Sequence, residues 1–526
     1  MKVLVSDNLG EAGLEIFRAQ PGIELDVKTG LKPDELIAII GDYDGLAIRS
    51  ATKVTAEVLA AAKNLKVVGR AGIGLDNVDI PEATRRGVVV MNTPGGNTVT
   101  TAEHAISMML ALTRNIPQAT AGLKAGRWEK KTLEGREIFN KVLGVIGFGN
   151  IGTIVADRAR GLRMQVIVYD PFVTPERIEK AGFTPATLDE IYAKSDYISV
   201  HVPKLKETAN LLNAGAFAKM KTGVMVINCA RGGIVNEADL EAAIVSGKVA
   251  GAALDVFETE PPGDHPLLKL AQVIATPHLG ASTAEAQTNV AVAVAQQINE
   301  YLVNGTIINA VNVPSVTGEL LVRLNPLLTL GERMGCLQAQ LASGPVKEVS
   351  IEYTGDFRGL DLSPVTTAVL KGFLTPAMKD DVNFVNAQVM AKERGITVTT
   401  STRSESEDFT NLVSVRAQGE GFSQTVAGTI YGKKEPKIVR INNFRVEMTP
   451  VGHLLLIHND DRPGAIGTIG VTMGQAGVNI ARMYVGQETD GDHNFIVLET
   501  GVPTPPETLQ ALRDLPIIKS VTPVEL

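Results

Sequence analysis

A glycine-rich turn set between two apolar runs restricts the fold of this chain more than any other feature. The segment Lys141–Gly152 reads KVLGVIGFGNIG, an apolar run that ends in a Gly-x-Gly-x-x-Gly turn. A helical pattern follows over Thr153–Leu162, and a second apolar run, Met164–Tyr169, leads directly to Asp170. Strand, glycine turn, helix, strand and acid follow in the order that a dinucleotide-binding βαβ unit requires.

Each glycine of this turn has a separate task. Gly147 permits the tight turn, Gly149 lets the backbone approach a pyrophosphate, and Gly152 lets the helix pack on the strand. The helix N-terminus offers free N–H groups and partial positive charge to the phosphates. Asp170 favours NAD over NADP, because a carboxylate accepts a hydrogen bond from a ribose 2′-OH and repels a 2′-phosphate.

Length, charge and cysteine content exclude several classes of protein. The 526 residues suggest about three or four domains, and the net charge of −8 gives no general attraction to nucleic acid or to anionic membranes. With only Cys229 and Cys336, neither a disulfide framework nor a Cys-based zinc site is expected, and we predict no metal site. No apolar stretch reaches the ~18 residues of a membrane span. We therefore expect a cytoplasmic protein with no nucleic-acid or membrane partner.

Alternating strand and helix patterns predict two parallel sheets, each covered by helices. In the first hundred residues, strands are expected at Lys2–Val5, Ile23–Val27, Gly45–Ile48, Leu65–Val68 and Val88–Met91. A helical pattern from Thr100 to Arg114 precedes the dinucleotide unit, and later strands are expected at Tyr197–Val200, Val224–Asn228, Val249–Leu254 and Val273–Ala275. After a helix over Ser282–Leu302, the composition changes near Val311–Pro314. A helical pattern (Leu320–Leu341) is then mixed with alternating strands, and a separate strand–helix–strand block begins near His453.

Polar residues gather where the predicted strands end. In the second sheet these are Asn228–Gly233, Asp255 with Glu260 in the next loop, and Thr276–Gly280. In the first sheet they are Arg49, Ser50, Arg70–Gly74 and Asn92–Asn97. Because parallel α/β sheets bind ligands outside the carboxyl ends of their strands, we expect both edges to face one cleft.

These residue types suit hydride transfer between an alcohol and a nicotinamide. The reaction needs a base for the hydroxyl proton, a role that suits an imidazole side chain, and His278 is the candidate. A carboxylate such as Glu260 on the other ring nitrogen would fix the tautomer. The planar fork of Arg231 suits a substrate carboxylate or a polarised carbonyl. Arg49, with Ser50 and Arg70, is a candidate for a further anion such as phosphate.

Less informative interpretations apply to single residues. His104 lies in an Ala/Met-rich helical setting and is interpreted as structural, and His201 follows a strand without an acid partner. Cys229 is expected to pack against the cofactor rather than to react. An isolated arginine is usually a solvated surface group, so the hypothesis depends on Arg231, Glu260 and His278 following successive strands.

These segments resemble the D-isomer-specific 2-hydroxyacid dehydrogenase family, and within it the long members with a C-terminal ACT domain. The resemblance covers essentially the whole chain and rests on Arg70–Asn77, Asn92–Asn97, Leu143–Gly152, Asn228–Val235, Ala253–Pro262 and Thr276–Thr283. It implies an α/β fold of two Rossmann-like, doubly wound parallel-sheet lobes, an α+β intervening domain and a ferredoxin-like ACT domain. The expected domains are a substrate-binding lobe (1–97, completed by 283–313), an NAD-binding lobe (98–282), an intervening regulatory domain (314–450) and the ACT domain (451–526).

The resemblance also implies an activity, the NAD-dependent oxidation of 3-phospho-D-glycerate to 3-phosphooxypyruvate that begins L-serine biosynthesis. Arg231 is implied to bind the substrate carboxylate, Glu260 to partner His278, and His278 to act as acid and base. The implied NAD contacts are Gly147, Gly149, Asn150, Ile151, Gly152, Asp170, Cys229, Ala230, Arg231, Asp255, His278, Gly280 and Ala281. The implied substrate contacts are Arg49, Ser50, Arg70, Asn97 and Arg231. The helix after Thr100 is implied to build the interface of a homodimer or homotetramer.

The C-terminal block resembles an amino-acid sensor. Asn459, Asp461 and Asn479 match effector positions, which implies feedback by L-serine. Alternatively, Asp461 only caps the helix Ala465–Ala476, and Asn479 only begins the next strand. In the intervening block, the basic residues Lys437, Arg440 and Arg445 are either an anion site or a solvated strand face.

Two other functions remain open at this point. One is another dehydrogenase or reductase of the same family, acting on glyoxylate, hydroxypyruvate or 2-oxoglutarate; an amino-acid sensor favours a biosynthetic enzyme over these. The other is an NAD-gated, corepressor-like binding protein. That function predicts a disordered protein-binding tail and no amino-acid sensor, and the sequence fits neither.

Overall fold

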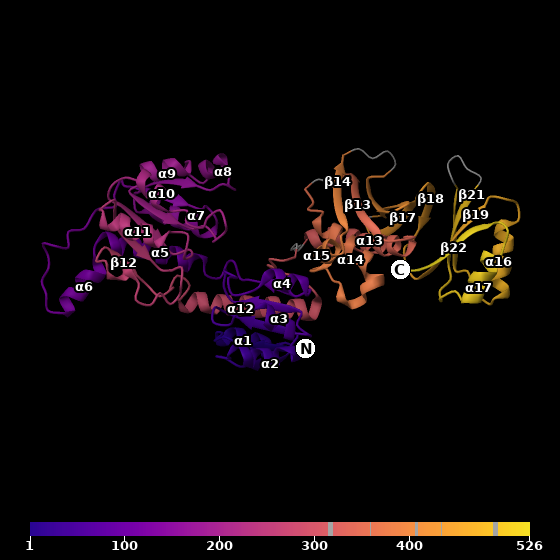
Figure 1. Ribbon diagram of the computed structural model, residues 1–526, viewed down its shortest axis with the longest axis horizontal. Helices are drawn as coiled ribbons and strands as arrows, with labels where there is room; N and C mark the ends of the chain where they lie inside the picture. Colours follow the sequence, from indigo (N-terminus) through magenta and orange to yellow (C-terminus); the bar gives the residue numbers. More distant parts are fainter. Residues whose placement is uncertain (314–318, 358, 405–408, 433, 488–492) are drawn as a thin grey trace.

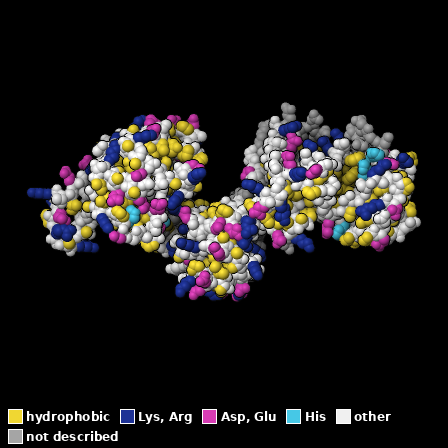
Figure 2. Space-filling model, viewed as in Figure 1, with side chains coloured by type: hydrophobic (Ala, Val, Ile, Leu, Met, Phe, Trp, Pro, Cys, Tyr) yellow, Lys and Arg dark blue, Asp and Glu magenta, His cyan; other side chains and the backbone are white. Residues whose placement is uncertain are grey.

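The computed structural model describes residues 1–313, 319–357, 359–404, 409–432, 434–487 and 493–526. Their strands form sheets of five, seven, six and four strands, in units that follow one another along an elongated molecule (Figure 1). Lys and Arg side chains are interspersed with those of Asp and Glu over the visible face (Figure 2). No helix among the described residues is long and apolar enough to cross a membrane.

The first sheet is parallel and has the strand order β2-β1-β3-β4-β5. This is the flavodoxin-like doubly wound order. Its strands are β1 (Lys2–Val5), β2 (Glu24–Val27), β3 (Gly45–Ile48), β4 (Val67–Arg70) and β5 (Val89–Met91). Its helices are α1 (Glu11–Ala19), α2 (Pro33–Ile39), α3 (Ala56–Ala61) and α4 (Ile80–Arg85).

A helix from much later in the chain completes this lobe. The helix α12 (Ala284–Asn304) places Val294 and Ile298, both fully buried, on the sheet formed by β1, β3 and β4. Gly69 on β4 makes the approach possible, since a Cβ there would lie 2.6 Å from Ile298 Cδ1. The chain therefore returns to its first lobe after building the second (Figure 1).

The second sheet is also parallel, with the strand order β12-β11-β10-β9-β6-β7-β8. Counted from β6, this is the Rossmann order, in which successive strands are added on one side of β6 as far as β8 and on its other side from β9 onward. Its strands are β6 (Val142–Ile146), β7 (Gln165–Tyr169), β8 (Thr184–Pro185), β9 (Tyr197–Val200), β10 (Val224–Asn228), β11 (Val249–Leu254) and β12 (Val273–Ala275). Its helices are α5 (Thr98–Thr113), α6 (Ile116–Lys124), α7 (Asn150–Gly161), α8 (Pro175–Lys180), α9 (Leu188–Lys194), α10 (Ala214–Lys219) and α11 (Glu237–Val245).

The third sheet is mixed and the fourth is antiparallel. The third, in the order β14-β13-β15-β16-β17-β18, contains β13 (Val346–Gly355), β14 (Thr397–Arg403), β15 (Asn411–Gly419), β16 (Phe422–Tyr431), β17 (Glu435–Ile441) and β18 (Phe444–Met448). Its helices are α13 (Glu319–Leu341), α14 (Ser363–Met378) and α15 (Ala387–Glu393). The fourth, in the order β20-β21-β19-β22, contains β19 (His453–Asp460), β20 (Arg482–Gln487), β21 (His493–Glu499) and β22 (Ile518–Glu525), with α16 (Ala465–Gln475) and α17 (Pro506–Arg513). Its βαββαβ order is that of a ferredoxin-like fold.

Side-chain contacts link neighbouring units. Asn383, before α15, donates from Nδ2 to the carbonyl of Gly87 at the end of α4 (2.9 Å), and Val385 joins the core of the first lobe. Gln340 on α13 donates from Nε2 to the carbonyl of Glu525 on β22 (2.8 Å), and its Oε1 accepts from the Glu525 N–H (3.0 Å).

The predicted fold class is confirmed, and several local predictions are corrected. The helix after the glycine turn begins at Asn150 rather than Thr153. Asp461 does not cap α16, whose N-cap is Gly464 without a side-chain cap bond, and Asn479 precedes the strand β20 instead of beginning it. The domain limits remain a proposal, and the limit at residue 314 lies outside the described residues.

Candidate functional site

Residues at the strand ends of the two lobes meet across the cleft. Arg231, in the loop after β10, donates from Nε to Asp76 Oδ2 in the loop after β4 (3.0 Å). Its second hydrogen bond goes from Nη1 to the carbonyl of Ala230 (2.7 Å). The guanidinium lies against Gly74, where a Cβ would stand 1.8 Å from Nη2. The expectation of one shared cleft agrees with this contact. Asp76 was not among the predicted site residues.

His278 and Glu260 form a hydrogen-bonded pair. His278 Nδ1 lies 2.8 Å from Glu260 Oε2, while Glu260 Oε1 accepts from the Phe257 N–H (3.1 Å). One oxygen of the Glu260 carboxylate is therefore bonded to the backbone, and the other fixes the His278 imidazole. With Nδ1 bonded to Glu260, the free nitrogen is Nε2, which is exposed enough to meet a substrate, since 46% of the His278 side chain is accessible.

The glycine turn has the space that a dinucleotide needs. Gly147 has a positive φ of 97°, and a Cβ on Gly152 would lie 1.9 Å from the Gly147 carbonyl oxygen. A Cβ on Gly149 would meet nothing within 4 Å, so open space lies beside the N-terminus of α7. These three environments fit the three tasks expected from the sequence. Asn150 and Ile151 form the first turn of α7, where the helix N–H groups are free for phosphate.

Asp170 lies at the end of β7, beside a cavity of about 400 Å³. Its carboxylate accepts hydrogen bonds from the N–H of Phe148 in the glycine turn (2.7 Å) and from the N–H of Phe172 (2.8 Å). The acid is thus fixed next to the turn, at the position where the sequence predicts recognition of a ribose. The residues around the turn, the open helix N-terminus and this cavity together fit NAD.

Three arginines lie close together at the cleft, Arg49 and Arg70 from the first lobe and Arg231 from the second. The pKa of Arg70 is lowered to about 10, first by burial and then by the charges of Arg231 and Arg49, against the opposing effect of Asp76. Arg70 Nε donates to Asn77 Oδ1 (3.1 Å), and Arg49 Nη1 donates to the carbonyl of Asn8 (2.9 Å). A cluster of cations this close favours an anionic ligand.

The remaining predicted substrate residues are Ser50, exposed after β3, and Asn97, buried at the N-cap of α5. Asn97 Oδ1 is buried, and among the described residues it has no hydrogen-bond partner. Cys229 is buried directly after β10. Burial and the charge of Asp255 raise the pKa of its thiol. A thiol kept protonated in this way is a poor nucleophile, which supports the interpretation of Cys229 as a packing residue. The loop after β12 holds His278, Gly280 and Ala281, and Asp255 follows β11.

In the fourth sheet, the predicted effector residues lie near the end of β19 (Asn459), just after it (Asp461) and before β20 (Asn479). Asn459 is fully buried and donates from Nδ2 to the carbonyl of Asp460 (2.7 Å), while its Oδ1 is buried without a partner among the described residues. Asp461 accepts a hydrogen bond from Asn494 Nδ2 (2.8 Å). Asn479 is exposed in the turn before β20.

Comparison with known proteins identifies the class. Residues 106–280 match the NAD binding domain of D-isomer specific 2-hydroxyacid dehydrogenases, and residues 453–517 match the ACT domain. A glyoxylate reductase from Paecilomyes thermophila is 28% identical, with a TM-score of 0.55 over 59% of this chain and 98% of that chain. A D-lactate dehydrogenase from Aquifex aeolicus, solved with NAD and lactic acid, is 27% identical, with a TM-score of 0.54 over 60% of this chain and 100% of that chain. Fold and site thus define an NAD-dependent dehydrogenase of the D-2-hydroxyacid class.

Full-length relatives narrow this class. The D-3-phosphoglycerate dehydrogenase of Archaeoglobus fulgidus is 44% identical over all of both chains, and that of Bacillus subtilis is 41% identical over 100% of this chain and 99% of its own. Residues 323–442 match the D-3-phosphoglycerate dehydrogenase intervening domain. The chain belongs to the D-3-phosphoglycerate dehydrogenase family.

Proposed function

We propose that the protein oxidises 3-phospho-D-glycerate to 3-phosphooxypyruvate with NAD, as the first step of L-serine biosynthesis. The observation that carries this proposal is the full-length similarity to D-3-phosphoglycerate dehydrogenases, together with a cleft that holds Arg49, Arg70 and Arg231. A phosphorylated hydroxy acid carries two anionic ends, and this cleft offers a cation for each. Glyoxylate and D-lactate, the acids in the names of the two solved relatives, carry one negative charge each and need only one cation.

Proton transfer is assigned to His278. With Nδ1–H donating to Glu260, the lone pair of Nε2 faces the cleft and takes the hydroxyl proton of the substrate as the C2–H bond breaks. Bound NAD supplies the acceptor for the hydride that leaves C2. Glu260 keeps the imidazole in this tautomer and stabilises the imidazolium that forms.

Arg231 is assigned to the substrate carboxylate, and Arg49 to the phosphate. A guanidinium binds a carboxylate through two parallel N–H groups, which fixes C2 relative to His278. In the described structure, Nε and Nη1 of Arg231 are bonded to Asp76 and to the Ala230 carbonyl, so a carboxylate that binds through the Nε side of the guanidinium must replace Asp76.

The test compares 3-phospho-D-glycerate with D-glycerate, measured as NADH formation. We expect Arg49→Ala to lower kcat/KM for the phosphorylated acid by about 10–100-fold, since a hydrogen bond to a charged group contributes about 1.5–3 kcal/mol. D-glycerate turnover is expected to stay unchanged. Arg85→Ala is the matched control, because Arg85 is an exposed arginine of the same lobe that pairs with Glu82. Equal losses on both substrates, or a wild-type preference for D-glycerate, would contradict the assignment.

We propose L-serine as an effector of the ACT domain. The Oδ1 of Asn459, buried and without a partner among the described residues, supports an amino-acid site at this end of β19. The test is the initial rate with increasing L-serine. Inhibition that Asn459→Ala weakens, with the uninhibited kcat kept, supports the proposal, and an identical response of wild type and variant contradicts it.

We also propose a homodimer or homotetramer formed through α5, α6 and the segment that follows. Large apolar side chains are exposed there: Leu123 (58%), Trp128 (82%) and Phe139 (59%). Exposed apolar patches of this kind mark protein interfaces, and α6 projects from its lobe (Figure 1). Light scattering after gel filtration is expected to give a multiple of the chain mass. Trp128→Glu is expected to lower the mass, and a wild-type monomer would contradict the proposal.

A further inference from the structure

Asp255 is the centre of a hydrogen-bond cluster behind the His278 loop. Its Oδ1 accepts from Thr276 Oγ1 (2.6 Å) and from the Leu279 N–H (2.7 Å), and its Oδ2 accepts from the Gly280 N–H (2.8 Å). The backbone is tied in as well, since the His278 N–H donates to the Asp255 carbonyl (2.9 Å). One buried residue thus holds the loop on both sides of His278.

The loop needs this restraint because His278 has a positive φ of 54°. A non-glycine residue in the left-handed region is disfavoured and persists only where its surroundings impose it. The two N–H groups that follow His278 both point to the Asp255 carboxylate, so the ionised carboxylate imposes the turn. If the carboxylate moved or took up a proton, the imidazole would lose its fixed place beside Glu260.

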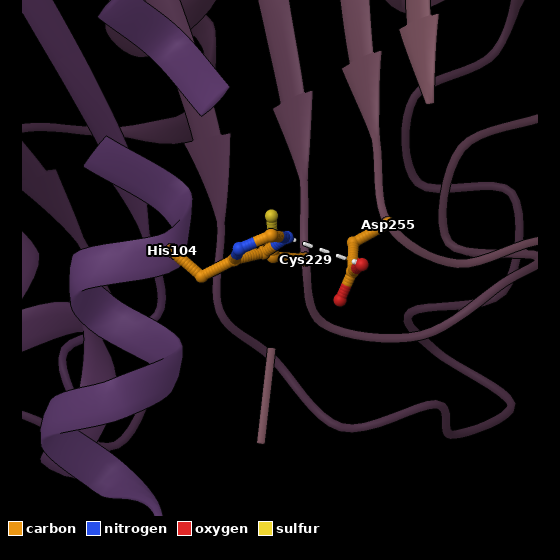
Figure 3. Close-up of side chains that lie close together, drawn as sticks. All are labelled: His104, Cys229 and Asp255. Atoms are coloured by element: carbon orange, nitrogen blue, oxygen red, sulfur yellow. Dashed lines mark hydrogen bonds and ion pairs between the residues drawn. The ribbon is translucent and has the colours of Figure 1, made fainter. Parts of the chain in front are cut away.

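His104 reaches this carboxylate from the opposite side. It lies on α5, and its Nε2 is 3.2 Å from Asp255 Oδ1 and 3.1 Å from Thr276 Oγ1. Figure 3 shows the imidazole extending from α5 toward Asp255, across the position of Cys229. His104 and Asp255 are 151 positions apart in the chain. The contact therefore links a helix outside the catalytic loops to the loop that carries His278.

The electrostatics agree with this geometry. Burial raises the pKa of Asp255, but the hydrogen bond from His104 and those from Thr276 and the Leu279 N–H more than offset it, leaving the pKa below its usual value. Among these partners, His104 has the largest effect. Asp255 therefore stays ionised although it is only 1% exposed.

A metal site is the alternative interpretation of the same residues. One ligand atom each from His104, Cys229 and Asp255 lies within 4.8 Å of the others. The donor set fits a metal poorly, because the Asp255 oxygens already accept from Thr276, Leu279 and Gly280. Burial also raises the pKa of the Cys229 thiol, whereas a metal needs the thiolate. We therefore interpret the cluster as a hydrogen-bond network.

We propose that His104 is a positioning residue for His278, acting through Asp255. The proposal rests on the assignment of His278 as the acid and base of the proposed function. The hydrogen bonds of His104 go to Asp255 and Thr276 and not to His278, so its removal changes the geometry of the loop rather than the reacting group itself. A displacement of about 1 Å in a reacting group can cost about 100-fold in rate.

The experiment measures kcat and KM for His104→Phe, His104→Gln and Thr113→Val, each also in a His278→Ala background. The Phe variant removes the hydrogen bond and keeps a ring, while the Gln variant keeps an N–H near the position of Nε2. Thr113 is the matched control, since it is a buried polar residue of α5 that bonds to the Met109 carbonyl and Tyr197 instead of the loop. His104→Leu replaces the Phe variant if that chain does not fold.

We expect His104→Phe to lower kcat by about 10–100-fold, His104→Gln to restore it to within a few-fold, and Thr113→Val to leave it unchanged. In the His278→Ala background, His104→Phe is expected to cause no further loss, because its effect passes through the imidazole. An unchanged kcat in His104→Phe, an equal loss in both backgrounds, or no rescue by Gln would overturn the proposal. Each comparison is the kcat of a variant divided by the kcat of its parent on the same substrate. If 3-phospho-D-glycerate is not the substrate, the wild-type rate on it will be low, which tests the proposed function. The kcat ratios can then be measured on another 2-hydroxy acid, so the role of His104 is tested separately.

Discussion

Gly152→Ala tests whether the close approach of α7 to the glycine turn is a requirement of the fold. A Cβ at this position would lie 1.9 Å from the carbonyl oxygen of Gly147, and real Cβ contacts essentially never fall below 3.0 Å. The obstacle is a backbone oxygen, so no side-chain rotation can relieve it. The helix must move by about 1 Å or more in a close-packed layer, where small displacements already cost energy.

The expected cost follows from this displacement. Overpacking of this kind costs about 1–3 kcal/mol, which corresponds to a fall of about 2–12 °C in the Tm of a lobe of this size. Because α7 also carries the N–H groups for the phosphates, NAD affinity is expected to fall as well. Thermal unfolding followed by fluorescence gives the first quantity, and calorimetric titration with NAD gives the second.

Two neighbouring glycines provide the controls. At Gly149 a Cβ would meet nothing within 4 Å, so Gly149→Ala is expected to keep the Tm but raise the Kd for NAD by about tenfold or more, because the methyl group fills the space of the pyrophosphate. At Gly161, the last residue of α7, a Cβ would also meet nothing within 4 Å. Gly161→Ala is therefore expected to keep the Kd for NAD and to keep or raise the Tm. A Gly152→Ala protein with wild-type Tm and Kd would refute the reasoning, as would a Gly149→Ala protein that unfolds early.

Two further predictions concern charge. Asp170→Ala is expected to reduce the preference for NAD over NADP by about 10–100-fold, since the variant loses a charged acceptor for the 2′-OH and its repulsion of a 2′-phosphate; an unchanged ratio of kcat/KM values would mean that another group recognises the ribose. Burial lowers the pKa of His201 from 6.5 to about 4, so the unfolded chain takes up this proton first as the pH falls. The free energy of unfolding is therefore expected to drop by up to about 3 kcal/mol between pH 6.5 and 4, with the full contribution present above pH 6.5. Denaturant titrations of wild type and His201→Asn across this range check the prediction, and parallel curves would contradict it.

The sequence predicts those parts of the fold in which local pattern and tertiary pairing agree. Strands Tyr197–Val200, Val224–Asn228, Val249–Leu254 and Val273–Ala275 occur as predicted. The first three are short apolar runs buried on both faces of a parallel sheet, and the last is a short edge strand in which Ile274 is buried. The predicted strand Leu65–Val68 is found instead at Val67–Arg70. Its limits depend on pairing with β3, where Arg70 lies opposite Ile48. The apolar run alone does not show which residues pair, so the sequence does not predict these limits.

Within the site, the sequence indicates residues that follow strands, and it misses the partners that hold them. Glu260 and His278 are recognisable because both lie just past strands of one sheet, and they are found 2.8 Å apart. Asp76 lies in the loop after β4, which is a signal that the sequence contains, but its pairing with Arg231 joins positions 155 residues apart. The role of His104 could not be predicted, since its helical setting is apolar and its partner Asp255 comes from another element.

The pair of Arg231 and Asp76 has a consequence for how the two lobes act together. Arg231 belongs to the nucleotide lobe and Asp76 to the first lobe, so their 3.0 Å contact spans the cleft in which substrate must bind. An acid among three arginines opposes the binding of an anion, yet it also reduces their mutual repulsion. When a substrate carboxylate takes the place of Asp76 at the guanidinium, the bridge between the lobes passes from a side chain to the substrate. Occupancy of the site and closure of the lobes then depend on the same ion pair, which is how binding energy can be used to exclude water from hydride transfer.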